Sequence, residues 1–179
     1  ATALSRRGGI DVVVNNAGIA GPQEPAASTP LAGWDATVAV NLTGTFLMCK
    51  HAIPHLVRRQ GCIVNVASAL AFIGWPRECA YGPTKAGVVQ LTKAMALDYA
   101  PHVRINCVCP GAVRTAMIES VLPAGDKEAL LSEYGKVHPL HGRLAHPDEI
   151  AWPVLFLASD DASLITGAAL VVDAGFSIG

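Results

Sequence analysis

The stretch Cys62-Ile63-Val64-Asn65-Val66-Ala67-Ser68, with Tyr81-Gly82-Pro83-Thr84-Lys85 beginning thirteen residues after Ser68, decides the fold. The apolar run over 62–67 is nearly continuous rather than alternating, as is typical of a strand buried on both faces. A helix-compatible stretch follows from about Ala80 to Tyr99 and stops before Pro101. This order predicts parallel strands joined by crossover helices.

The rest of the chain repeats this alternation of short apolar runs and long helix-compatible segments. Further strands are predicted at Ile10–Val14, Val103–Cys109 and Ala169–Val172. One long helix is predicted over Pro30–Gln60, because Ser28, Thr29 and Pro30 form a start signal and Gly61 ends it. We therefore expect one α/β domain over residues 1–179, with a Rossmann-like, doubly wound parallel sheet.

Two segments complete this organisation. A third helix is predicted from about Pro147 to Ser159, where Asp148 and Glu149 suit the positive end of a helix. The polar segment Arg114–Arg143 is interrupted by prolines and glycines, and it predicts short helices and loops. An excursion of this kind is typical of a substrate pocket or a lid.

Composition excludes several classes of partner. The formal net charge is −1 and only 15% of residues are charged, so nothing favours nucleic acid or an anionic membrane surface. No apolar run approaches the roughly 20 residues that span a bilayer. The cysteines are five in number and lie in apolar segments, which predicts reduced thiols and a cytoplasmic protein: Cys49, Cys62, Cys79, Cys107 and Cys109.

Polar or glycine-containing motifs follow three successive predicted strands. Asn15-Asn16-Ala17-Gly18 follows the first, Ser68 the second and Pro110-Gly111 the third. Ligands of open parallel sheets bind at the carboxyl ends of the strands. The sequence therefore predicts a binding site along that edge.

Tyr81 and Lys85 are four residues apart at the start of a predicted helix, so they share one face with Cβ atoms roughly 5–6 Å apart. An isolated pair of this kind is usually a surface aromatic and a solvated lysine. The chemical interpretation is that the ammonium lowers the tyrosine pKa, which makes Tyr81 a general acid/base. Ser68 is placed to hydrogen-bond the oxygen where charge changes.

The chain resembles the short-chain dehydrogenase/reductase family from Gly9 to Gly175. The resemblance rests on motifs at the family's order and spacing: Asn15-Asn16-Ala17-Gly18, Val40-Asn41-Leu42-Thr43-Gly44, Ile63-Val64-Asn65-Val66-Ala67-Ser68, Tyr81-Gly82-Pro83-Thr84-Lys85, Pro110-Gly111-Ala112-Val113-Arg114-Thr115, Gly142-Arg143-Leu144, Asp148-Glu149-Ile150-Ala151, Ile165-Thr166-Gly167 and Val172-Asp173-Ala174-Gly175. Two small departures are Ala67, where many relatives have serine, and Ala174, where many have glycine.

The resemblance implies an oxidoreductase that uses NAD or NADP to interconvert a small-molecule carbonyl and alcohol. Tyr81 would be the acid/base, Lys85 would lower its pKa and bind the nicotinamide ribose, and Ser68 would polarise the substrate oxygen. Asn41 would hold a water that links Lys85 to a proton relay. The remaining cofactor contacts implied are Asn15, Ala17, Gly18, Pro110, Val113 and Thr115, and Trp75 would face the substrate.

The family's glycine-rich cofactor segment has no counterpart in the sequence. By resemblance the chain begins just before the family's fourth strand, so we expect three strands of the sheet to be missing and Ile10–Val14 to form an edge. One hypothesis is an oxidoreductase whose preceding segment is absent from this sequence. The alternative is a catalytically silent member that acts by self-association or by binding a full-length relative.

Two further expectations concern partners and metals. The resemblance implies a homodimer or homotetramer, in which the helices over Pro30–Gln60 and Ala80–Tyr99 contact a second subunit. His51 and His55 share a helix face, but no third ligand lies nearby in sequence, so no metal site is predicted.

Overall fold

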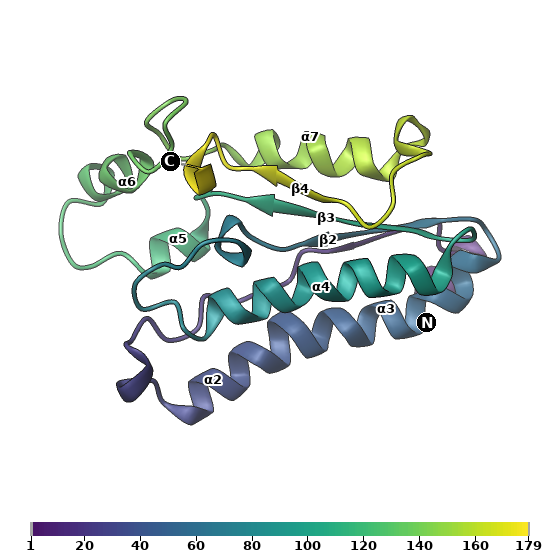
Figure 1. Cartoon of the computed structure of the whole chain (residues 1–179), viewed down its shortest axis with the longest axis horizontal. Coiled ribbons are helices and arrows are strands. Elements are labelled where there is room, and N and C mark those ends of the chain that lie inside the picture. The colour runs from purple at the N-terminus through teal and green to yellow at the C-terminus, as the bar shows by residue number, and fades with distance from the viewer. Residues whose placement is uncertain (1, 179) are drawn as a thin grey trace.

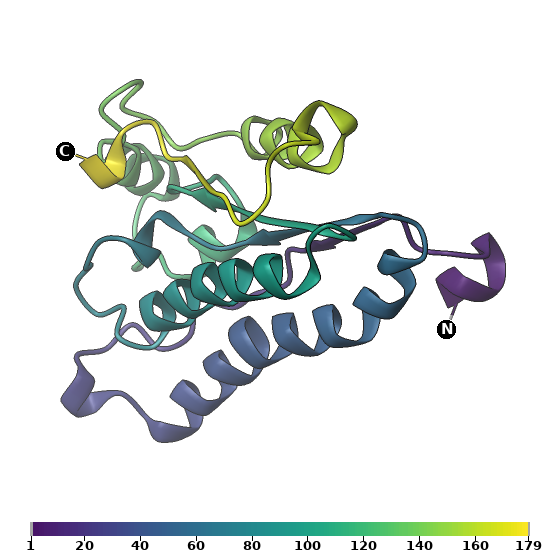
Figure 2. The same ribbon diagram turned by 45° about the vertical axis from the view of Figure 1, so that its right-hand side comes forward.

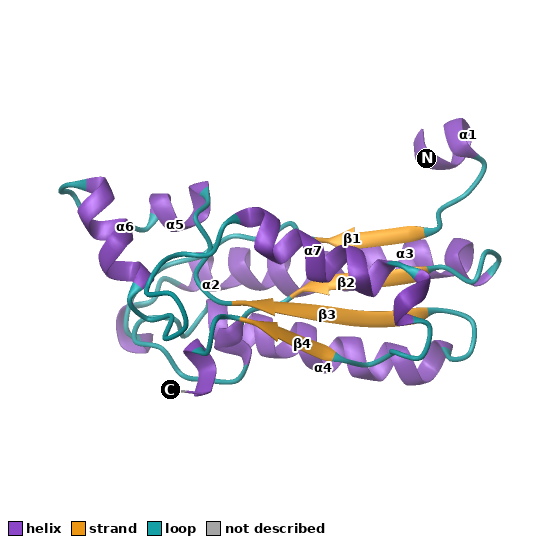
Figure 3. Ribbon diagram, turned by 90° about the horizontal axis from the view of Figure 1, so that it is seen from above, coloured by secondary structure: helices purple, strands orange, loops and turns teal. Residues whose placement is uncertain are grey.

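The computed structural model describes residues 2–178, and its strands form one parallel sheet in the order β1-β2-β3-β4. The predicted α/β parallel sheet is confirmed (Figure 3), and every strand lies within two residues of its predicted bounds. Among the described strands, β1 lies at one edge and pairs only with β2. The strands are β1 Val12–Asn15, β2 Cys62–Val66, β3 Arg104–Pro110 and β4 Ala169–Val172.

Helices cover both faces of this sheet, as a doubly wound fold requires (Figures 1 and 2). Helices α2, α3 and α4 lie on one face and α7 lies on the other. Short helices α5 and α6 stand beyond the carboxyl ends of the strands, and α1 lies at the opposite end (Figure 3). Their bounds are α1 Thr2–Arg7, α2 Leu31–Val38, α3 Gly44–Val57, α4 Tyr81–Tyr99, α5 Ala116–Ser120, α6 Lys127–Gly135 and α7 Pro147–Ala158.

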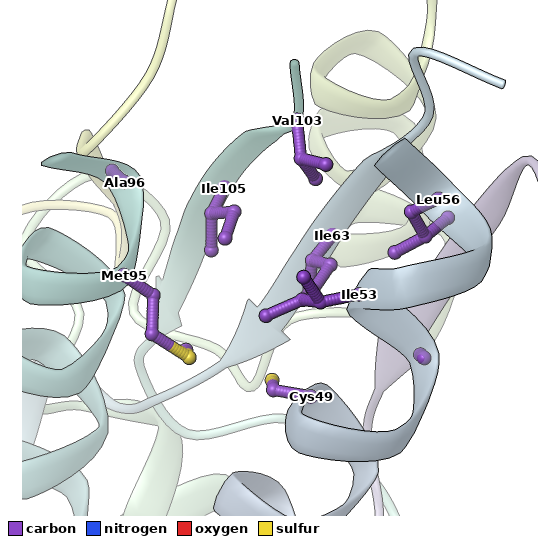
Figure 4. Close-up of a cluster of buried hydrophobic side chains, with 9 residues drawn as sticks. Cys49, Ile53, Leu56, Ile63, Met95, Ala96, Val103 and Ile105 are labelled. Atoms are coloured by element: carbon purple, nitrogen blue, oxygen red, sulfur yellow. The ribbon is translucent and has the colours of Figure 1, made fainter. Parts of the chain in front are cut away.

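The core lies on both faces of the two central strands, β2 and β3. Ile63 and Ile105 are fully buried, and Figure 4 shows them among side chains of α3 and α4. On the opposite face, Val64 and Val108 pack against Leu157 of α7. Burial on both faces explains why these strands read as continuous apolar runs. The side chains that α3 and α4 contribute to the first cluster include Cys49, Ile53, Leu56, Met95 and Ala96.

The helix predicted over Pro30–Gln60 is helical over 31–57, with a π-helical turn inside it. A π-helical turn, Ala39–Thr43, separates α2 from α3. Such a turn inserts one extra residue, and it is frequent at functional sites. Asn41 lies in this turn and is 1% exposed. Its side-chain amide makes hydrogen bonds with the backbone of Ile19, which is outside the helix. A helical pattern in the sequence carries no sign of that partner.

Asn106 is a polar side chain buried in the middle of β3. Its Nδ2 donates to Ile165 O at 2.8 Å, and its Oδ1 accepts from Ala168 N at 2.9 Å. These two bonds hold the turn that leads into β4 against β3. Buried amides are stable only when they are paired in this way.

The excursion between β3 and α7 contains α5 and α6 as short helices, as the sequence predicts. Asp126 caps α6 by accepting hydrogen bonds from Glu128 N and Ala129 N. Within residues 2–178, no helix is both long enough and apolar enough to cross a membrane.

Replacement of Asn106 by alanine tests the link between β3 and the turn before β4. Asn106→Ala leaves the Ile165 carbonyl and the Ala168 amide without their partner, so the free energy of unfolding should fall by about 2–4 kcal/mol. Urea denaturation followed by circular dichroism measures the change. Gln90→Ala on the exposed face of α4 is the control and should change the value by less than about 0.5 kcal/mol. A loss below about 1 kcal/mol in Asn106→Ala would contradict this account.

Candidate active site

A cavity of about 1150 Å³ opens along the carboxyl edge of the sheet. It is lined by β1, by the segments that follow β1, β2 and β3, by the start of α4, and by parts of α5, α6 and α7. The sequence predicted a binding site along this edge. The predicted site residues that line it are Ala17, Gly18, Ser68, Trp75, Tyr81, Lys85, Pro110, Val113 and Thr115.

Tyr81 and Lys85 meet at the start of α4, where the helix enters the cavity. The Lys85 Nζ lies 5.5 Å from the centroid of the Tyr81 ring and donates to Val66 O at 2.9 Å. Lys85 is only 4% exposed. Pro83 is accommodated because the N–H groups of a first helical turn have no partner within the helix. The end of β2 and the first turn of α4 thus fix the ammonium beside the tyrosine.

Burial disfavours the charged form of both groups, so it shifts their pKa values in opposite directions. It raises the pKa of Tyr81 to about 12, and the hydrogen bond with Ser68 works in the opposite direction. It lowers the pKa of Lys85 to about 8. The expected lowering of the Tyr81 pKa is wrong for the chain as it stands, since desolvation is the larger effect. Tyr81 therefore carries its proton at neutral pH.

Asn41 joins the end of the first strand to the helices. Its Oδ1 accepts from Ile19 N at 2.8 Å, and its Nδ2 donates to Ile19 O at 2.9 Å and to Thr84 Oγ1 at 3.3 Å. A Cβ on Gly18 would lie 3.3 Å from Asn41 Oδ1 and 3.5 Å from Lys85 Nζ. Asn41 itself does not line the cavity. It holds the Ala17–Ile19 segment against Lys85.

Ser68 begins the loop that follows β2. Its extended backbone places the hydroxyl at the N-cap of a 3-10 turn, Ala69–Ala71, where it accepts from Leu70 N at 3.2 Å. The side chain is 8% exposed and lines the cavity together with Tyr81. The hydroxyl thus faces the cavity on the same side as the phenol.

Asn15 lies at the end of β1, and its side chain turns into the core. Its Nδ2 donates to Asn65 Oδ1 at 2.8 Å and to Cys49 Sγ at 3.2 Å. Asn65 in turn donates to Thr92 Oγ1 at 2.9 Å. The next residue, Asn16, lines the cavity instead. Neighbouring side chains of a strand point to opposite faces, so Asn15 points into the core while Asn16 faces the cavity.

The segment after β3 is shaped by a close approach to His138. A Cβ on Gly111 would lie 2.5 Å from His138 Nε2, so only glycine fits there without displacement. His138 Nε2 accepts from Ala112 N at 3.0 Å, and its Nδ1 lies 2.6 Å from Arg143 O. This contact fixes the backbone that carries Pro110 and Val113 into the cavity. Thr115 follows at the start of α5.

Trp75 lies in the loop between β2 and α4 and packs edge-on against Phe176, with ring centroids 5.2 Å apart. Both rings line the cavity. Sequence reasoning missed Phe176, Asn16, Gln23 and Glu78, which also line it. Of these, only Asn16 carried a signal, because it belongs to the motif after the first strand.

A family model described as enoyl-(acyl carrier protein) reductase matches residues 1–177. The chain belongs to the short-chain dehydrogenase/reductase family, whose members are NAD(P)-dependent oxidoreductases. The resemblance that the motifs indicated is therefore confirmed.

Individual relatives agree with this membership. The chain is 40% identical to cis-4-hydroxycyclohexanecarboxylate dehydrogenase of Sinomonas cyclohexanicum, over 98% of this chain and 69% of the relative. It is 39% identical to the aldohexose dehydrogenase structure from Thermoplasma acidophilum, with a TM-score of 0.93 over 99% of this chain and 72% of that one. It is 31% identical to ElxO with NADP bound, with a TM-score of 0.89 over 98% and 70%. The chain thus spans about seven-tenths of each.

The Lys85 ammonium at the strand ends has the chemistry to bind hydroxyls such as those of a cofactor ribose. An ammonium has three donors, and Lys85 uses one of them on Val66 O while it lines the cavity, so it suits hydroxyl acceptors. As for metals, no three His, Cys, Asp or Glu side chains gather into a metal site within residues 2–178.

Replacement of Asn41 by alanine tests its hold on the Ala17–Ile19 segment. Asn41→Ala removes both bonds to Ile19, so hydrogen exchange of the Ile19 amide should accelerate by about tenfold or more. Exchange read by NMR or mass spectrometry measures it on the whole chain. Asp35→Ala, at an exposed position on α2, should leave the exchange unchanged. Unaltered protection of Ile19 in Asn41→Ala would contradict the assigned role.

Proposed function

We propose that this enzyme interconverts a carbonyl and an alcohol, with Tyr81 as the acid/base. The observation that carries the proposal is the meeting of Tyr81, Lys85 and Ser68 at one cavity, with Nζ 5.5 Å from the tyrosine ring. Core packing does not require these three polar groups at a strand end and a helix start. General acid/base catalysis does require them in such a place.

The proton chemistry follows from the shifted pKa values. In reduction, the protonated Tyr81 phenol donates its proton to the substrate oxygen, and Ser68 hydrogen-bonds the same oxygen. The nicotinamide, when bound, supplies or accepts the hydride. In oxidation, Tyr81 must accept the proton, and the Lys85 ammonium favours the phenolate that does so.

The cofactor class is NAD or NADP, as in the family. We assign the nicotinamide end to Lys85, Gly18 and the backbone around Pro110 and Val113. This assignment is supported by the cavity that these residues line together. Thr115 extends it along the start of α5, and Asn41 acts through the Ala17–Ile19 segment.

Removal of the Tyr81 hydroxyl tests the assigned acid/base. Tyr81→Phe should lower kcat by about 10²–10⁴-fold, because the proton donor is lost while the ring still packs. NADH binding, followed by nicotinamide fluorescence, should stay within about threefold of the parent. Tyr99→Phe at the far end of α4 is the matched control and should keep full activity. An active Tyr81→Phe enzyme would rule out this assignment.

The enzyme is also proposed to be a homodimer or homotetramer. Apolar side chains stand exposed on the outer faces of the helices that cover one side of the sheet. These include Phe46, Leu47 and Met48 of α3 and Leu97 of α4. Monomeric proteins rarely expose a large apolar patch, so a second subunit covers these positions in this proposal.

A charge placed on α3 tests this interface. Met48→Glu should convert the assembly into monomers at micromolar concentration, because burial of an unpaired carboxylate in an apolar contact is strongly unfavourable. Light scattering coupled to size exclusion measures the mass. Ser132→Glu on the exposed face of α6 adds the same charge elsewhere and should leave the mass unchanged. A monomeric parent protein would overturn the proposal.

The cytoplasm is the proposed compartment. All five cysteines are free thiols, and four of them are buried. Burial raises the pKa of the Cys49 thiol to about 11, so this thiol is an unreactive packing group. Free buried thiols are typical of proteins from reducing compartments.

A further inference from the structure

Glu78 is an acidic side chain in the wall of the cavity, three residues before Tyr81, and the proposed mechanism does not use it. It lines the cavity together with Trp75, Ser68 and Tyr81. Its backbone pairs with Glu24 in an isolated parallel bridge, which joins the loop after β1 to the loop before α4. Two loops from different strand ends therefore fix the position of Glu78.

The Glu78 carboxyl has one partner and one free oxygen. Oε1 accepts a hydrogen bond from Gln23 Nε2 at 2.5 Å. Oε2 is buried and is the one buried side-chain oxygen or nitrogen within residues 2–178 that lacks a hydrogen-bond partner. Buried polar atoms in native proteins almost always have a partner. Oε2 is buried behind the cavity surface, so the carboxyl must turn toward the cavity to meet a group of the substrate.

The charge state of Glu78 suits a hydroxyl. Burial raises the pKa of its carboxyl to about 7, so a large share of the carboxyls keep their proton near neutral pH. A protonated carboxyl both donates and accepts hydrogen bonds, as a hydroxyl does.

The cavity offers a single cation to an anionic substrate. Lys85 is the one basic side chain among the described residues that line it, and its ammonium already donates to Val66 O. His138 lies nearby, but both of its ring nitrogens are engaged, with Ala112 N and Arg143 O. A carboxylate or phosphate placed against Glu78 would meet a carboxyl that is partly ionised near neutral pH, which disfavours an anion at this position.

We propose that Glu78, positioned by Gln23, binds a second hydroxyl of the substrate, so that the enzyme acts on neutral diols or polyols and the matching hydroxyketones. This proposal rests on the proposed function, in which Tyr81 reacts with the first hydroxyl. It assigns Glu78 to substrate selection and Gln23 to the positioning of its carboxyl.

Matched substrates test the proposal on the enzyme with NAD or NADP. Oxidation of 2,3-butanediol is compared with 2-butanol, and 1,2-cyclohexanediol with cyclohexanol, while 3-hydroxybutyrate represents hydroxy acids. The kcat/KM for the diol should exceed that for the mono-alcohol by about tenfold or more, because an alcohol that lacks the second hydroxyl leaves Glu78 unpaired. The hydroxy acid should be the poorest substrate.

Three variants separate recognition from folding. Glu78→Leu should reduce the diol to mono-alcohol ratio by about tenfold, and Glu78→Gln should restore most of it, because an amide also donates and accepts. Glu24→Leu is the matched control, since its backbone pairs with Glu78 while its side chain is exposed and lies outside the main cavity. Tryptophan fluorescence gives the dissociation constant of the diol independently, because Trp75 lines the same wall.

The outcomes separate the role of Glu78 from the oxidoreductase function. An enzyme that oxidises the hydroxy acid better than the diols, or whose ratio is the same in Glu78→Leu, would overturn the role of Glu78 and leave the oxidoreductase function intact. An enzyme that oxidises no member of the panel would overturn both proposals. A diol preference that is lost in Glu78→Leu and regained in Glu78→Gln would establish the role.

Discussion

The amide of Asn41 holds both backbone groups of Ile19, and the arrangement of the cavity depends on this pair of hydrogen bonds. The π-helical turn exists where the amide leaves the helix to reach them. Through Thr84, the same side chain also reaches α4, the helix that carries Tyr81 and Lys85. One residue therefore sets the distance between the end of the first strand and the catalytic helix. A regular helix through 39–43 would place the amide differently.

Desolvation is the main cause of the shifted pKa values of three side chains in the cavity, Tyr81, Glu78 and Lys85. Burial disfavours charge of either sign, so the pKa values of Tyr81 and Glu78 rise while that of Lys85 falls. Each group is thereby kept closer to its neutral form. At neutral pH the Tyr81 phenol keeps its proton, the Glu78 carboxyl is partly protonated and the Lys85 ammonium is mostly charged. The cavity therefore holds a proton donor beside a cation, as proton exchange with a substrate oxygen requires.

Most of the fold could be predicted from the sequence, because buried parallel strands leave an unambiguous apolar pattern in runs such as Cys62–Ala67. The polar motifs at the strand ends and the Tyr81–Lys85 spacing located the cavity, because ligands of open parallel sheets bind at the carboxyl ends of the strands. The π-helical turn could not be predicted, since it depends on a partner more than twenty residues away. The direction of the Tyr81 pKa was also missed, because spacing reveals a neighbouring charge but not the depth of burial. Glu78 lies in a loop, where no periodicity marks which side chain faces inward.

The contact between Gly111 and His138 links two positions that lie 27 residues apart in the sequence. Glycine is required at 111 because the imidazole fills the space of a side chain, and the imidazole is held there by Ala112 N. Evolutionary change at either position is therefore constrained by the other. Related sequences with a larger residue at 111 should also lack His138, and libraries built to enlarge residue 111 should vary both codons together.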